Sequence, residues 1–255
     1  MVDPAHPPAH RRAQHSIRSA IRPSAGPSPV DVNVAVVTFV LAWVAAQIAS
    51  SLVVGMFGGG SSIADTSIGV IAAALIAAWS AYLAGMWFAS RRGGSGDPIE
   101  DYGITFAPID AIGLGIGVLS QLVLIELVYL PLEAIWPDTF TDDRLQENAK
   151  ELVDQAGGAS TLVLVLLIVI GAPFVEELFY RGLLQRSLAA RFNDSIVLIG
   201  VAALFALVHF RPVEYPGLFA FGLVVGTCAL LTGRLGMAIV THMAFNATGL
   251  VLAWS

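Results

Sequence analysis

The sequence predicts an all-α fold, a polytopic membrane helical bundle of about seven hydrophobic helices. Of the 255 residues, 56% are hydrophobic and only 13% are charged, and the mean hydropathy is +0.76. Soluble domains carry charge on about a quarter of their residues, whereas the uncharged stretches here approach or exceed the roughly 20 residues that cross a bilayer as a helix. We therefore expect a multi-pass integral protein of the cell membrane, surrounded by lipid.

The helix count follows from seven uncharged stretches, at residues 32–64, 66–90, 111–125, 157–175, 195–210, 215–233 and 235–255. The fifth and sixth are short for a full crossing, so their helices are expected to be tilted, to line a cavity or to span half the bilayer. The first stretch is longer than the apolar core of a signal peptide, about 7–15 residues, and no small-residue cleavage site follows it. It is expected to remain as an anchor.

Residues 1–30 are rich in proline and arginine and lack apolar periodicity, which predicts a disordered basic tail. His6, His10 and His15 lie in this tail, and histidines scattered through a flexible segment are usually solvated, so we assign no metal site to them. Under the positive-inside rule the tail lies in the cytoplasm, as does the loop at Arg91-Arg92.

An acidic segment, residues 133–159, divides the remaining chain. Its carboxylates outnumber its two basic residues, which suits an extracytoplasmic linker. Residues 31–132 before it are predicted to be N-terminal transmembrane helices, in which Gln47 and Glu126 are the exceptional polar groups; Glu126 is interpreted as interfacial because the linker is near. Residues 160–252 after it hold most of the recognisable polar patterns.

Two further features exclude classes of function. The basic residues are scattered and not gathered into a patch, so we expect no nucleic-acid partner. Cys228 is the single cysteine and lies in an apolar stretch, which excludes an intrachain disulfide and indicates a packing residue. The oligomeric state has no signal in the sequence.

Three patterns in the last third of the chain place polar groups four residues apart, a spacing that puts both members on one helix face. They are Glu176-Glu177-x-x-x-Arg181, Phe205-x-x-x-His209 and His242-x-x-x-Asn246. A carboxylate costs roughly 3 kcal/mol near the bilayer centre, so it needs a partner, a wet cavity or a function. Glu177 can pair with Arg181, whereas Glu176 is rotated by about 100° from it. We therefore expect Glu177 and Arg181 to form a structural pair and Glu176 to remain available for chemistry.

The depth of these groups can be counted along the helices. Glu176 lies 17 residues before Asn193, where a turn is expected, and His209 lies 16 residues after it. An antiparallel helical hairpin then places the two side chains at nearly the same height, facing one another. His242 and Asn246 follow the next turn, so all four groups are expected to converge on a cavity that opens toward the cytoplasm.

Each pattern alone has a structural explanation, since Phe-x-x-x-His carries little information and His-x-x-x-Asn can be an interhelical hydrogen bond. All three in order, within a charge-poor segment, favour a function. A proton-coupled transporter is an alternative, because intramembrane Glu and His also form proton relays, but it predicts polar groups in several helices and an internal repeat. A non-catalytic membrane scaffold is the other alternative, and it would not need His242 and Asn246.

The sequences Ala172-Pro-Phe-Val-Glu-Glu-Leu-Phe-Tyr-Arg-Gly182, Ala203-Leu-Phe-Ala-Leu-Val-His209 and Thr241-His-Met-Ala-Phe-Asn246 resemble the CPBP family of intramembrane proteases. That family includes CAAX prenyl endopeptidases of the Rce1 type and bacteriocin-processing or immunity (Abi) proteins. The resemblance covers the core at 160–252. It implies an endopeptidase that hydrolyses a peptide bond of a membrane-associated protein or peptide through a water molecule activated by a glutamate.

Carried onto this chain, the resemblance implies that Glu176 is the general base, that His209 orients the water, and that His242 and Asn246 donate to the oxyanion. Glu177, Arg181 and Phe205 are then structural support. The family is often labelled as metalloprotease, and Glu176, His209 and His242 are acceptable zinc ligands. Because the chain lacks His-Glu-x-x-His, the usual sign of a hydrolytic zinc site, we expect a mechanism without a cofactor, with zinc as the alternative.

Overall fold

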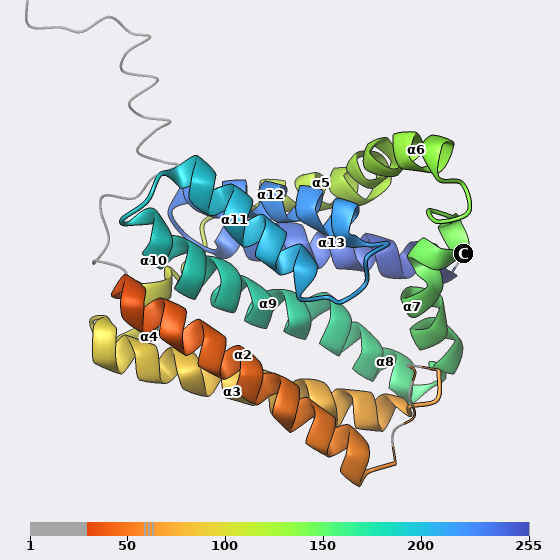
Figure 1. The fold of residues 1–255 in the computed structure, drawn as a ribbon, viewed down its shortest axis with the longest axis horizontal. Coiled ribbons are helices and arrows are strands. Elements are labelled where there is room, and N and C mark those ends of the chain that lie inside the picture. The colour runs from red at the N-terminus through yellow and green to blue at the C-terminus, as the bar shows by residue number, and fades with distance from the viewer. Residues whose placement is uncertain (1–29, 59, 61, 63, 255) are drawn as a thin grey trace, which may run out of the picture.

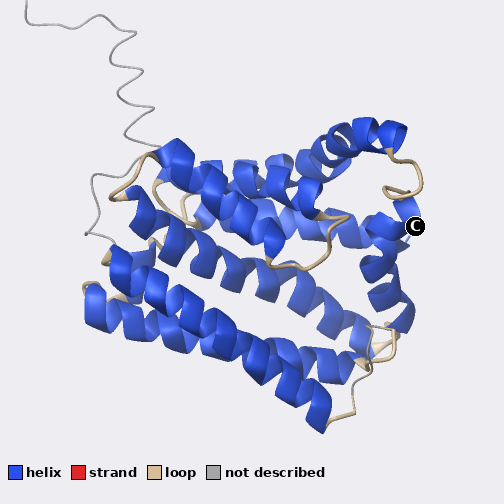
Figure 2. Ribbon diagram, viewed as in Figure 1, coloured by secondary structure: helices blue, strands red, loops and turns tan. Residues whose placement is uncertain are grey.

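The computed structural model describes residues 30–58, 60, 62 and 64–254. The predictions for the tail, including His6, His10 and His15, therefore lie outside the described residues, which begin at Val30. The described chain is 81% helical and has no strand, which confirms the all-α prediction (Figure 2). Six helical runs are long and apolar enough to cross a membrane, and a seventh, Asp194–Leu207, is shorter. The protein is thus built as a multi-pass membrane protein.

The first two helices, α2 (Val32–Met56) and α3 (Ile68–Gly93), form an antiparallel hairpin (Figure 1). Asp31 caps α2 by accepting from two backbone N–H groups, which satisfies donors that a helix start leaves unpaired. Small residues let the two helices approach closely: a Cβ atom added at Gly85 would lie 2.8 Å from the Cβ atom of Ala42. Such small-residue contacts are typical of helix pairs in membranes.

A short helix, α4 (Pro98–Tyr102), returns the chain toward the bundle after α3. The Tyr102 hydroxyl donates to the Met86 carbonyl, and the Asp101 carboxylate accepts from Ser90. The third span then consists of consecutive helical turns: η1 (Pro108–Ala111), α5 (Ile112–Leu119), η2 (Ser120–Leu124) and α6 (Ile125–Ile135).

The acidic segment contains a helix that the sequence reasoning did not assign, α7 (Asp142–Gln155). Thr141 caps it by accepting from the Arg144 N–H group. The helix is tied to the loop between the fifth and sixth apolar helices, because Arg211 of that loop binds Glu147 at 3.0 Å and contacts Asn148. The segment predicted to be a linker is therefore a packed part of the bundle.

The central run of helix, residues 159–189, carries Glu176 and Glu177. It comprises α8 (Ala159–Val165), η3 (Leu166–Gly171), α9 (Ala172–Glu176), η4 (Glu177–Gln185) and α10 (Arg186–Ala189). η3 and η4 are π-helical and flank the turn that contains Pro173. Proline cannot donate the usual backbone bond, and wide turns of this kind are common where helices carry functional groups. All nine residues of η4 are buried.

Three helices complete the bundle: α11 (Asp194–Leu207), α12 (Tyr215–Thr232) and α13 (Gly236–Trp254). Two glycines of α5 allow close packing of α13, the helix that carries His242 and Asn246. A Cβ atom at Gly113 would lie 2.9 Å from the Met237 carbonyl oxygen, and one at Gly117 would lie 2.2 Å from the Thr241 carbonyl oxygen. Only glycine permits this approach, so α5 sets the position of α13.

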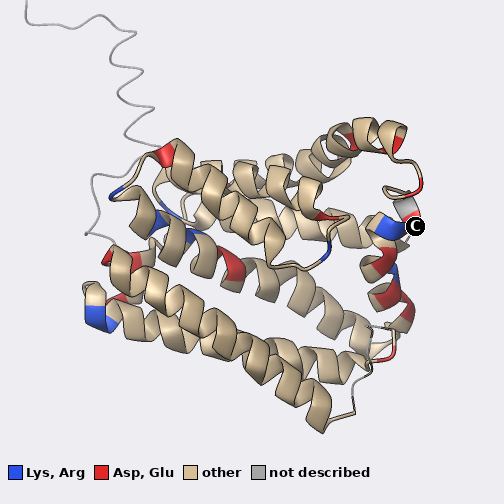
Figure 3. Cartoon of the chain, viewed as in Figure 1, with Lys and Arg blue, Asp and Glu red and all other residues tan. Residues whose placement is uncertain are grey.

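The two ends of the bundle differ in their content of arginine. Figure 3 shows most of the arginines, together with several acidic residues, at the end where α3 stops and α10 leads to α11, and mostly acidic residues on α7 at the other end. The positive-inside argument assigns the arginine-rich end to the cytoplasm, and this orientation stays a prediction.

The α5–α13 contact can be tested with two glycines of one helix. Gly117→Ala should destabilise the protein by about 1–3 kcal/mol, because the added methyl group meets backbone that cannot move aside. Gly115→Ala is the matched control, since nothing lies within 4 Å of its Cβ position. Thermal unfolding in detergent compares the two, and equal midpoints would show that the close contact is absent.

Candidate functional site

A buried ion pair lies at the centre of the site. Arg181 Nη1 donates to Glu177 Oε1 at 2.9 Å, and both side chains are 0% exposed. This is the contact predicted from the i, i+4 spacing. Arg181 also donates to the Gly222 carbonyl of α12 at 3.3 Å, and its guanidinium lies 4.5 Å from the centre of the Phe205 ring. These contacts compensate a charge that would otherwise be costly to bury.

Glu177 has a second partner, which the sequence did not predict. His242 Nδ1 lies 2.8 Å from Glu177 Oε1, the oxygen that also binds Arg181. Because a carboxylate only accepts, we assign the proton to Nδ1, so that this nitrogen donates. The other carboxylate oxygen, Oε2, is buried without a hydrogen-bond partner among the described residues. His242 is thus oriented by Glu177, and its Nε2 atom points to the other side of the ring.

Glu176 lies on that other side. Its Oε2 atom is 4.0 Å from His242 Nε2, and its side chain is 25% exposed, against 0% for Glu177. Glu176 makes no ion pair with an arginine among the described residues. Two adjacent carboxylates therefore have different surroundings: one is enclosed and paired, and the other is accessible and faces an imidazole.

His209 lies just beyond the end of α11. Its Nδ1 atom is 2.7 Å from the Phe205 carbonyl oxygen, which assigns the proton to Nδ1 and leaves Nε2 as an acceptor. The Phe205 ring packs edge-on against His209 at 4.9 Å and His242 at 6.0 Å between ring centres. Phe205 thus contacts both imidazoles and the Arg181 guanidinium. A direct contact between His209 and Glu176 is not seen among the described residues.

The backbone after His209 is unusual. Phe210 has φ of +54°, a left-handed conformation that is rare for a bulky side chain. Arg211 then binds α7 and pairs with Glu214 at 2.9 Å. Burial raises the pKa of Glu214 above its usual value, against the opposing effect of the Arg211 and His209 charges. The loop that carries His209 is thereby held to the acidic helix.

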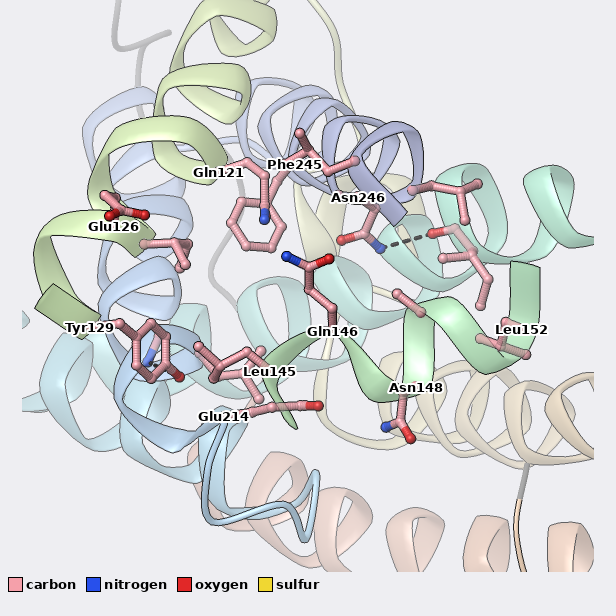
Figure 4. Close-up of a pocket in the computed structure, with 18 of the residues that line it drawn as sticks. Gln121, Glu126, Tyr129, Leu145, Gln146, Asn148, Leu152, Glu214, Phe245 and Asn246 are labelled. Atoms are coloured by element: carbon pink, nitrogen blue, oxygen red, sulfur yellow. Dashed lines mark hydrogen bonds between the residues drawn. The ribbon is translucent and has the colours of Figure 1, made fainter. Parts of the chain in front are cut away.

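Asn246 lies one turn after His242 and lines a pocket of about 390 Å³. Its amide donates to the Ile168 carbonyl of η3 at 2.8 Å. Figure 4 shows the side chains of Asn246, Gln146 and Gln121 around one common space. No hydrogen bond joins Asn246 to the other three predicted site residues in the described part of the chain.

Of the four residues predicted to share a cavity, Asn246 lines this pocket, whereas Glu176, His209 and His242 are not among its lining residues. The pocket is lined by residues of α6, α7 and α13, including Leu145, Gln146 and Leu152 of α7. This pocket therefore lies at the acidic end of the bundle, and the cavity expected to open toward the cytoplasm stays a prediction.

Sequence reasoning missed a group near Glu176. Tyr82 of α3 is buried and close enough to interact electrostatically with the Glu176 carboxylate, and its hydroxyl also interacts with the Gln47 side chain of α2. The Tyr82 ring stacks on Phe179 of the central run with 4.1 Å between centres. Gln47 is a rare polar residue in its helix, but no local spacing indicates which helix it meets.

The fit to a metal ion can be judged from the side chains. Among the described residues, no three His, Cys, Asp or Glu side chains are grouped so that they could hold a metal ion. Glu176, His209 and His242, the ligands considered from the sequence, form no such group.

A scan against protein-family models matches residues 158–248 to a family described as "Type II CAAX prenyl endopeptidase Rce1-like". This segment contains the central run of helix, α11, α12 and most of α13, and it includes all of the predicted site residues. The finding confirms the resemblance to the CPBP and Rce1-like proteases for this part of the chain. Neither the search of curated proteins nor that of solved structures found a match.

The buried pair gives a prediction about stability. Glu177→Gln should destabilise the protein by about 3–5 kcal/mol, because it leaves the Arg181 charge buried without its carboxylate. Asp143→Asn is the matched control, since it removes a carboxylate from an exposed pair with Lys150 and should change little. Thermal unfolding in detergent measures both, and similar small shifts would mean that the buried pair contributes no more than the exposed one.

Proposed function

We propose that the protein is an intramembrane endopeptidase that hydrolyses a peptide bond of a membrane-associated protein or peptide. The main support is the chain of contacts from Arg181 through Glu177 to His242, which ends opposite the accessible carboxylate of Glu176. This arrangement holds an imidazole beside a carboxylate that water can reach. The match of residues 158–248 to a family of endopeptidases agrees with it.

In this proposal Glu176 is the general base. It accepts a proton from a water molecule as the water attacks the carbonyl carbon of the scissile bond, and it then passes that proton to the leaving amine. Glu176 suits this role better than Glu177, because the Glu177 side chain is enclosed and already binds Arg181 and His242.

His209 would orient the attacking water. Its Nδ1–H group donates to the Phe205 carbonyl, so Nε2 can accept a hydrogen bond from the water. A fixed tautomer is useful here because a ring that could rotate or exchange its proton would not hold the water in one position.

His242 and Asn246 would stabilise the negative charge on the carbonyl oxygen. The Nδ1–H group of His242 is held by Glu177, and when the ring is protonated at both nitrogens its Nε2–H group donates toward the side where Glu176 lies. Asn246 donates one amide hydrogen to Ile168 and has a second to offer. A donor of this type typically contributes about 3 kcal/mol to the transition state.

We propose a mechanism without a metal ion, and it is supported by the absence of a group of three His, Cys, Asp or Glu ligands among the described residues. The substrate is expected to reach the site from the pocket beside Asn246, whose walls combine apolar and amide side chains.

Glu176→Gln should reduce cleavage by at least about a hundredfold, since the amide cannot accept the proton of the water. It should leave the unfolding midpoint unchanged, because Glu176 has no buried ion pair to lose. The assay incubates detergent-solubilised protein with a library of membrane-protein peptides in isotopically labelled water, and mass spectrometry detects the label in the new carboxyl termini. Glu100→Gln, an exposed carboxylate of α4, is the control. Cleavage by Glu176→Gln at the wild-type rate would refute the proposed base.

Metal content is tested separately. Elemental analysis of the purified protein should find zinc well below one atom per chain, and dialysis against a chelator should leave the cleavage rate unchanged. Stoichiometric zinc, together with activity that chelation removes and zinc restores, would contradict the metal-free mechanism.

A further inference from the structure

A second and smaller pocket lies at the arginine-rich end of the bundle, away from the proposed reaction site. It has a volume of about 100 Å³ and is enclosed by η4, α10 and the turn that joins α12 to α13. Three arginines line it, Arg181, Arg186 and Arg234, and no carboxylate does. Gly233, at its rim, is exposed.

The three arginines are not equally compensated. Arg181 is paired with Glu177, and Arg234 is paired with Asp110 at 2.8 Å. Arg186 forms no ion pair with any described residue, and its Nη1 atom donates to the Gly233 carbonyl at 2.8 Å. The Asp101 carboxylate of α4 acts on the Arg186 charge without forming an ion pair with it, so Arg186 is the arginine of this pocket with no carboxylate in direct contact among the described residues.

Two hydrogen-bond donors at this pocket have no acceptor. The Nε atoms of Arg181 and Arg186 are buried and make no hydrogen bond within the described part of the chain. Arg181 is only 1% exposed, so bulk water does not satisfy it. A buried donor without an acceptor costs about 1–3 kcal/mol, and more when it belongs to a charged group. Both donors belong to side chains that line the pocket, so an acceptor bound there could satisfy them after a small rotation of either guanidinium.

We propose that this pocket binds a phosphate group, supplied by the headgroup of an anionic lipid. Guanidinium groups bind phosphate through short, charge-assisted bonds. The pocket also lies at the arginine-rich end of a membrane bundle, and basic pockets between membrane helices bind lipid headgroups. Its volume is large enough for a phosphate group, given that a water molecule takes about 30 Å³.

The bound phosphate would also influence the reaction site through Arg181. Arg181 belongs both to the pocket and to the pair with Glu177, and Glu177 holds His242. An acceptor at Arg181 Nε fixes the guanidinium, and through it the carboxylate that orients the imidazole. Lipid binding itself does not depend on the proposed peptidase activity and can be measured without it.

The test uses the purified full chain in neutral detergent and follows its unfolding midpoint during titration with mixed micelles that contain phosphatidylglycerol. The midpoint should rise with phosphatidylglycerol and should not rise with diacylglycerol, which lacks the phosphate. Arg186→Gln should weaken the apparent affinity by at least about tenfold, the effect of losing one charge-assisted bond. A parallel titration with inorganic phosphate distinguishes the two sources of the phosphate group. If inorganic phosphate raises the unfolding midpoint of the wild type but not of Arg186→Gln, the pocket binds free phosphate as well.

Two further variants keep the test decisive. Arg191→Gln removes an arginine from the same end, one that is exposed and paired with Asp31, and it should bind phosphatidylglycerol as the wild type does. Ala229→Leu fills part of the pocket and retains all three arginines, so it should weaken binding even if Arg186→Gln does not fold. Equal losses in Arg186→Gln and Arg191→Gln, unchanged binding in Ala229→Leu, or the absence of a rise with either phosphate source would each overturn the proposal.

Discussion

The buried ion pair between Glu177 and Arg181 is the constraint on which the rest of the site depends. Two charges with no exposure to solvent must find their partners within the protein. Arg181 donates a hydrogen bond to the Gly222 carbonyl of α12 and packs against the Phe205 ring of α11. Glu177 accepts a hydrogen bond from His242 of α13. The pair therefore joins the central run of helix to three neighbouring helices. The residues proposed for catalysis are positioned by a requirement for electrostatic compensation.

The same constraint explains why two adjacent glutamates can have different roles. Glu177 is directed into the bundle, where each hydrogen bond it accepts makes its burial less costly. Glu176 is one residue away and therefore rotated out of that network, beside Tyr82 and His242. A carboxylate in this position keeps some access to water and still lies against an oriented imidazole. The asymmetry is produced by helix geometry and not by any difference between the two side chains.

The parts of this site that could be predicted are those with local spacing. The Glu177–Arg181 contact follows from one helical turn, and the helical runs follow from stretches without charge. The contacts of His242 with Glu177 and of Asn246 with Ile168 join residues more than sixty positions apart, so no periodicity could reveal them. The helix α7 was missed because its polar composition was interpreted as a linker. The pocket beside Asn246 could not be predicted for the same reason, since α7 forms one of its walls.

The N-terminal helices have a physical role that their apolar composition concealed. Phe39 of α2 and Tyr82 of α3 stack on opposite sides of Phe179, with ring centres 4.5 Å and 4.1 Å away. Phe179 lies two residues after Glu177 in the central run, so this stack fixes the rotation of the helix that carries both glutamates. Close packing of α2 against α3 at Gly85 is what brings the two rings near enough. Residues 31–132 thus act as more than an anchor, because the orientation of Glu176 depends on a surface that lies outside the segment matched to the endopeptidase family.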